Sequence, residues 1–198
     1  MPSPPRSSSW LYHGTGIYCL AHIALSNTLR EGGHWGKPDE PHGPRLSEQP
    51  ELAARFILYS SYWGEGGLVV FDRSMLARHY PLQSYRDRFY EGEAMPDEAE
   101  VAILSPEVNL DHGLISLTCD PRIIEEARKP EWMACAEEEG GWSFPPGPEG
   151  QALALKALDV LARHPKLNAW VPPTGHLRMG NFPLPPLPRS NGKRLPRP

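Results

Sequence analysis

Cysteine is scarce in this chain, and long apolar runs are missing. Its three cysteines, Cys19, Cys119 and Cys135, are widely spaced and show no paired pattern. An odd, scattered set argues against a disulfide framework and fits a reducing compartment. No charged segment followed by an apolar one begins the chain, and no run is long enough to cross a bilayer. We therefore expect a cytoplasmic protein with no membrane partner.

An excess of one charge sign is also absent. With 20 basic and 24 acidic residues the net charge is -4, which gives no general attraction to nucleic acid or to an anionic membrane. The C-terminal end is locally basic, with Arg189, Lys193, Arg194 and Arg197. We interpret it as a solvated tail, and contact with nucleic acid is the alternative.

Several familiar catalytic signatures are missing. The sequence has no P-loop, no G-x-S-x-G and no H-E-x-x-H. The stretch "LYHGTG", Leu11 to Gly16, resembles the start of a dinucleotide-binding G-x-G-x-x-G turn, but Cys19 stands where that turn needs a third small residue. His34 and His42 share a loop without a cysteine partner or helical spacing, so we predict a polar loop there and no metal site.

Proline, in contrast, is abundant. The 24 prolines gather at the ends and in loops, so the compact part should be shorter than the chain. We expect a disordered leader (1–9), a core (10–120), a helical C-terminal appendage (121–178) and a proline-rich basic tail (179–198).

Hydrophobic periodicity predicts both helices and strands within these limits. Strands are expected over 10–12, 45–47, 68–71, 100–104 and 114–117, with 108–110 extending the same sheet. Helices are expected over 17–29, 51–63, 74–79, 121–139 (broken at Pro130) and 149–164, and a polar loop over 81–97. Because the elements do not alternate regularly, we predict the α+β class. Ser47 is placed to cap the helix over 51–63.

The order of short motifs is informative. "LYHGT" ends a first strand, "RLS" precedes a helix containing "ELAARF", "LVVF" forms a buried strand, and "EAEVAIL" opens a later strand. This order resembles the ADP-ribosyltransferase superfamily, on the side of diphtheria toxin and poly(ADP-ribose) polymerases, with RNA 2′-phosphotransferases as near relatives. The resemblance covers about Trp10 to Leu117 and implies a split β-sheet core with flanking helices.

The resemblance also implies a set of roles around NAD, the substrate of that superfamily. His13 would bind a ribose hydroxyl, the backbone of Gly14 would bind the nicotinamide carboxamide, and Thr15 would support the strand end. Ser47 would lie near the nicotinamide amide. Phe56 stands where the family has a stacking tyrosine, and Tyr59 is a possible substitute.

The acidic residues would carry the chemistry. Glu100 matches the catalytic glutamate that contacts the nicotinamide ribose, and Glu98 is a possible second carboxylate. The implied reaction breaks the nicotinamide–ribose bond and transfers ADP-ribose to an unknown protein or nucleic-acid acceptor, as in a toxin or effector. The alternatives are an RNA 2′-phosphotransferase-like enzyme and a non-catalytic binding module with the same fold.

Each of these residues also has a purely structural interpretation. His13 could be a strand-end histidine satisfied by backbone groups. Phe56 and Tyr59 could be core residues, and Glu100 could be a solvated residue at the start of a strand.

Overall fold

The structure is a computed structural model that describes residues 9–31, 42–50, 53–54, 57, 65–85, 100–139 and 141–169. Its strands are β1 (Trp10–Gly16), β2 (Thr28–Arg30), β3 (Arg45–Ser47), β4 (Gly66–Asp72), β5 (Leu82–Tyr85), β6 (Glu100–Ile103), β7 (Glu107–Asn109), β8 (Leu114–Cys119) and β9 (Leu167–Ala169). Its helices are α1 (Ile17–Ser26), α3 (Arg73–His79), α4 (Pro121–Glu126), α5 (Pro130–Glu139) and α6 (Pro148–Ala162), with a 3-10 turn η2 (Leu110–His112). Pro50, Ala53, Ala54 and Ile57 are also helical and form the described part of the helix after β3.

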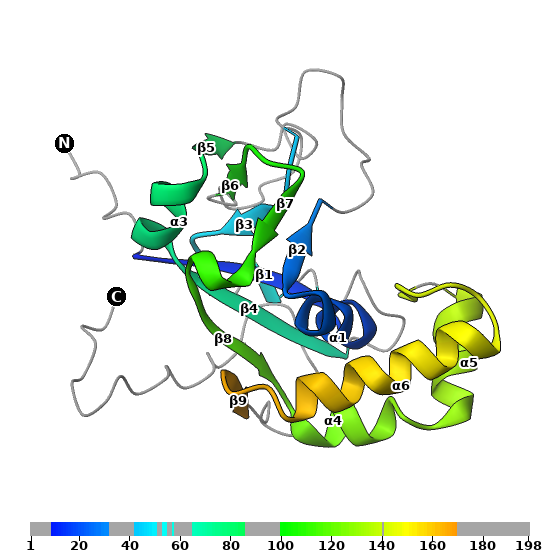
Figure 1. The fold of residues 1–198 in the computed structure, drawn as a ribbon. Coiled ribbons are helices and arrows are strands. Elements are labelled where there is room, and N and C mark those ends of the chain that lie inside the picture. The colour runs from blue at the N-terminus through cyan, green and yellow to red at the C-terminus, as the bar shows by residue number, and fades with distance from the viewer. Residues whose placement is uncertain are drawn as a thin grey trace, which may run out of the picture.

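Seven of the strands form one sheet, in the order β5-β6-β3-β1-β4-β8-β9. All neighbouring strands in it are antiparallel except β8 and β9, which are parallel. Figure 1 shows β3, β6 and β5 on one side of β1, with β4 and β8 on the other. Helices and an antiparallel-rich sheet together confirm the predicted α+β class.

The first strand is longer than its sequence predicts. Residues 10–12 are expected to form it, but β1 continues to Gly16 and pairs with β4 along its whole length. Gly14 and Gly16 are therefore strand residues and do not form a turn. Glycine is needed on the partner strand too, because a Cβ on Gly66 would lie 2.0 Å from the carbonyl oxygen of Thr15.

Three other predictions are corrected. The helix expected over 17–29 ends as α1 at Ser26, because Asn27 takes a left-handed conformation (φ 53°) and its N–H bonds to the Ile23 carbonyl. Residues 108–110, expected to extend the main sheet, do not: 107–109 pair as β7 with β2 in a separate two-stranded sheet, and Leu110 begins η2. Part of the polar segment expected to be a loop forms β5, which pairs with β6.

Buried side chains lie on both faces of the main sheet. Leu11, Val69 and Phe71 face a large cluster that also contains residues of α1, α4, α5 and α6. Tyr12, Leu68 and Val70 alternate with them and face a smaller cluster. Ala53, Ala54 and Ile57 complete this smaller cluster, so the helix after β3 covers the second face.

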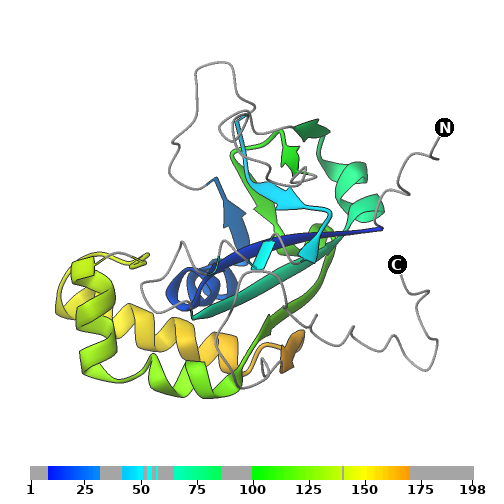
Figure 2. The same cartoon turned by 180° about the vertical axis from the view of Figure 1, so that it is seen from behind.

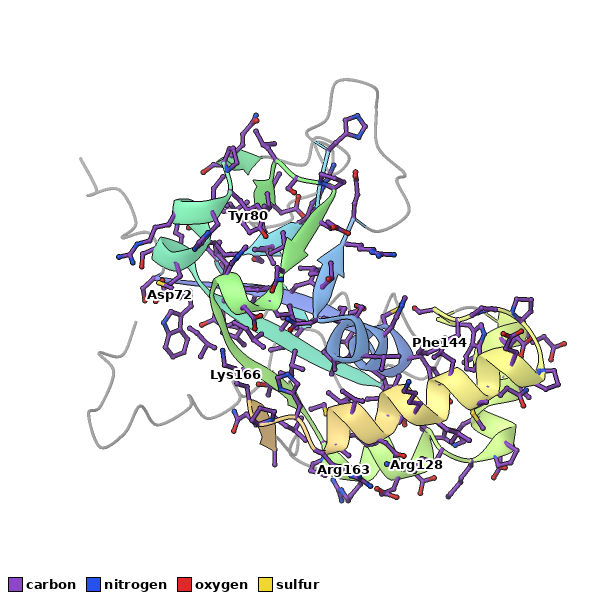
Figure 3. The ribbon with its side chains drawn as sticks, in the orientation of Figure 1. Asp72, Tyr80, Arg128, Phe144, Arg163 and Lys166 are labelled. Carbon is purple, nitrogen blue, oxygen red and sulfur yellow. The ribbon has the colours of Figure 1, made fainter. Side chains whose placement is uncertain are left out.

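The helices α4, α5 and α6 lie together beside α1, as the two opposite views in Figures 1 and 2 agree. An aromatic cluster joins the α5–α6 connection to α1. Trp142 contacts Tyr18 edge-on with ring centroids 5.0 Å apart, and Phe144 lies 5.2 Å from the ring of His22. Figure 3 shows Phe144 beside α1 and next to α6. These contacts tie the helical segment to the first helix of the chain.

Candidate functional site

Three of the residues assigned to a site lie on neighbouring strands. His13 is on β1, Ser47 on β3 and Glu100 on β6, and these strands are adjacent in the sheet. Ser47 is the register partner of Tyr12 on one side and of Glu100 on the other. The fold thus brings together three motifs that are far apart in the sequence.

The ring of His13 is held by a backbone group. Its Nδ1 lies 2.9 Å from the carbonyl oxygen of Arg45. A carbonyl oxygen only accepts hydrogen bonds, so Nδ1 must carry a proton, and in the neutral ring Nε2 is then the acceptor. Burial lowers the pKa of His13, which favours this neutral form at neutral pH.

Glu100 is a buried carboxyl group, with only 5% of the residue exposed. Its interpretation as a solvated residue is therefore wrong. The guanidinium of Arg45 lies beside it, with Nη1 3.7 Å from Oε2. Ser47 is opposite Glu100 in register, so Arg45 and Glu100 are diagonal neighbours on one face, within reach of a long side chain.

The pairing between β1 and β3 is much shorter than the pairing between β1 and β4. The register between these two strands contains one pair, Tyr12 and Ser47, whereas β1 and β4 pair from Trp10–Asp72 to Gly16–Gly66. Strand alternation puts Ser47 and Glu100 on the face of Tyr12, and His13 on the opposite face. Arg45 joins the two, because its carbonyl holds His13 while its side chain pairs with Glu100. The connection between His13 and Glu100 therefore passes through this arginine.

Gly14 lies under the helix after β3. A Cβ on Gly14 would lie 1.7 Å from the carbonyl oxygen of Ala53. The close approach of that helix by itself requires glycine here, in addition to the nicotinamide contact that the resemblance implies. The next residue, Thr15, is buried, with 5% exposed.

The hydroxyl of Ser47 has a structural partner. Its Oγ accepts a hydrogen bond of 3.0 Å from the N–H of Gln49, and helical positions begin at Pro50. The hydroxyl thus binds an amide just ahead of the helix, much as the predicted cap would. Phe56 and Tyr59, assigned to the nicotinamide ring, lie outside the described residues, as does Glu98.

Two further charged residues have unusual surroundings. Arg45 contacts Glu100 because of the register between β3 and β6, and the spacing R-x-S in the sequence only places Arg45 and Ser47 on one strand face. Glu65 was not singled out at all. Burial, with a smaller contribution from Glu126, raises its pKa to about 7.

The described ranges contain no group of three or more His, Cys, Asp or Glu side chains that could hold a metal ion. Within the same part of the chain, no helix is both long and apolar enough to pass through a bilayer. No family model, no curated protein and no solved structure matches this chain. The functional assignment therefore depends on the residues of the site themselves.

Proposed function

We propose that this protein is an NAD-dependent ADP-ribosyltransferase that breaks the nicotinamide–ribose bond with the help of Glu100. The observation that supports the proposal best is the placement of His13, Ser47 and Glu100 on the adjacent strands β1, β3 and β6. The resemblance assigns these three residues to one NAD site. Ser47 and Glu100 share one face of the sheet and His13 lies on the other, and Arg45 links them through its guanidinium and its carbonyl.

The surroundings of Glu100 suit the chemistry. Loss of nicotinamide leaves positive charge on the ribose, as in glycoside hydrolysis, and a carboxylate bonded to the neighbouring hydroxyl stabilises it. A carboxylate that is 5% exposed acts with little screening by water. The guanidinium of Arg45, with Nη1 3.7 Å from Oε2, also places a positive charge beside this carboxylate.

The protonation state of His13 suits the binding of a sugar hydroxyl. With Nδ1 donating to the Arg45 carbonyl, the neutral ring offers Nε2 as an acceptor. A ribose hydroxyl is a suitable donor for that atom. The same backbone contact fixes the plane of the ring before NAD binds, which reduces the entropy cost of binding.

The direct test is the release of nicotinamide from NAD by wild type and by Glu100→Gln. The glutamine keeps the shape of the side chain but removes its charge, so we expect a rate lower by about 100-fold. Glu107→Gln is the matched control, because Glu107 lies on β7 with 61% of its side chain exposed. We expect it to keep the wild-type rate.

Equal rates in wild type and Glu100→Gln would remove Glu100 from the mechanism. Turnover of a 2′-phosphorylated oligonucleotide in place of NAD would support the RNA 2′-phosphotransferase alternative. A folded wild-type protein that shows no heat of binding with NAD would instead favour the non-catalytic module.

A further inference from the structure

Arg45 contacts both sides of the candidate site through two different groups. Its backbone carbonyl accepts a hydrogen bond from Nδ1 of His13 at 2.9 Å. Its guanidinium Nη1 lies 3.7 Å from Oε2 of Glu100. The arginine side chain is 22% exposed and the glutamate side chain 5% exposed, so the pair is largely withdrawn from water.

These two contacts have different chemical consequences. The carbonyl fixes which nitrogen of His13 carries the proton, and it is present whatever side chain residue 45 has. The guanidinium attracts the Glu100 carboxylate and restrains its orientation, and this effect depends on the side chain alone. Substitution of Arg45 therefore separates the restraint of Glu100 from the restraint of His13.

The position of Arg45 in the sheet explains how one residue contacts both His13 and Glu100. It lies on β3, which shares a single register pair, Tyr12–Ser47, with β1. β3 also pairs with β6 at all three of its residues, including Ser47 with Glu100. Arg45 is therefore paired in the sheet with β6, the strand of Glu100. Its carbonyl contacts His13 on β1, where the pairing of β1 with β3 is short.

We infer that Arg45 is a positioning residue that orients the carboxylate of Glu100 for bond cleavage and leaves NAD binding to other groups. This inference rests on the proposed function. It differs from a role as a pyrophosphate ligand, which would act mainly on the affinity for NAD. The two roles therefore predict different kinetic effects for the same substitution.

The kinetic test compares wild type, Arg45→Met and Arg45→Lys in nicotinamide release from NAD. For Arg45→Met we expect kcat to fall on the order of 10-fold or more while KM stays near its wild-type value. Arg45→Lys, which keeps a positive charge, should recover part of the lost kcat. A rise in KM with unchanged kcat would overturn the inference in favour of pyrophosphate binding.

The matched control is a second cross-strand pair of the same residue types. Arg30 Nε lies 3.6 Å from Glu107 Oε2, and these side chains are 67% and 61% exposed. Arg30→Met should change neither kcat nor KM, because this pair lies on β2 and β7 and outside the main sheet. A loss of kcat equal to that of Arg45→Met would indicate a general effect of removing an arginine and would overturn the inference.

A double-mutant cycle tests the contact without any need for activity. Arg45→Met, Glu100→Gln and the double variant are compared in urea unfolding. We expect the midpoint shifts of the single variants not to add up in the double variant, whereas Arg30→Met and Glu107→Gln should be nearly additive. Additive shifts at Arg45 and Glu100 would overturn the inference. A wild type that releases no nicotinamide while the cycle shows coupling would overturn the proposed function and, with it, the catalytic part of the inference.

Discussion

Individual carboxyl groups in this protein differ widely in their surroundings. Asp72 accepts hydrogen bonds from Ser74 and from the Met75 amide, which help lower its pKa against the opposing effect of burial. At Glu65, in contrast, burial and the nearby Glu126 act in the same direction and raise the pKa to about 7. The charge of Glu65 therefore changes near neutral pH, so its effect on stability can be measured under mild conditions.

Glu65 should make the folded state less stable as the pH rises towards 8. Its pKa is about 7 in the folded state against an ordinary value of 4.5. Below 4.5 both states hold the proton, and between 4.5 and about 7 only the folded state does, so the free energy of unfolding falls over this range and stays low above it. Glu65→Gln stays neutral, so it should resist urea better than wild type at pH 8 and by a smaller margin at pH 5.

The measurement is the urea midpoint of both proteins at several pH values between 5 and 8. Only the difference between the two curves is used, because it cancels the contributions of titratable groups that the two proteins share. Glu107→Gln is exposed and should follow the wild-type curve. Parallel curves for wild type and Glu65→Gln would contradict the prediction.

At the scale of elements, the helix after β3 packs closely against β1 through small residues. Ala53 and Ala54 are each 1% exposed, and the Ala53 carbonyl oxygen faces Gly14. The hydroxyl of Ser47 holds the chain at the start of this helix through Gln49. The strand, the turn and the first part of the helix therefore form one closely packed unit beside the candidate site.

Gly14→Ala should disrupt that unit. The new Cβ would lie 1.7 Å from the Ala53 carbonyl oxygen, so backbone would have to move. We expect a loss of about 1–3 kcal/mol in the free energy of unfolding, measured with urea. Thr15→Val, the next residue on the same strand, keeps its volume and is the control with the smaller expected effect. A Gly14→Ala protein as stable as wild type would show that the helix can shift without cost.

The residue pattern predicted some helices and strands correctly and missed others. "LVVF" is apolar and β-branched, and it lies within β4 as expected, while the periodic apolar residues of 149–164 form α6. The strand at Gly14 and Gly16 has poor strand formers, and it depends on glycines of the partner strand that sequence alone does not pair with it. β2 and β9 have three residues each, which is too short for a period to be seen.

The candidate site was likewise predictable from the sequence only in part. The resemblance of their motifs assigns His13, Ser47 and Glu100 to one site, and their roles around NAD stay predictions. Their adjacency depends on the strand order β6-β3-β1, which no local pattern contains. The contact of Arg45 with Glu100 follows from the register of β3 and β6, so it becomes visible only in the folded chain.

At the scale of the whole molecule, the C-terminal helices complete the core. Ile124, Met133, Ala154 and Leu158 are buried in the same cluster as Leu20 and Ala21 of α1. After α6, the strand β9 adds to the main sheet beside β8. The segment expected to be an appendage thus shares its buried surface with residues of the segment expected to be the core.

A chain that ends at residue 120 should therefore fail to fold cooperatively. It would expose the face of α1 that packs against α6, so we expect the loss of the whole free energy of unfolding, on the order of 5–15 kcal/mol for a domain. Urea unfolding with fluorescence and circular dichroism measures this. A chain that ends at residue 169 keeps every described element and is the control. A sharp transition in the shorter chain would show that the two segments are separate domains.

The two outer strands of the main sheet have a consequence for contacts between molecules. β5 has four residues and β9 has three, and Pro81 and Pro165 stand just before them. Within the described residues, each edge therefore offers only a few backbone groups to a strand from another chain. If the described strands form the whole of both edges, this sheet should resist growth by edge-to-edge aggregation, because strands of three and four residues give little backbone for another strand to pair with.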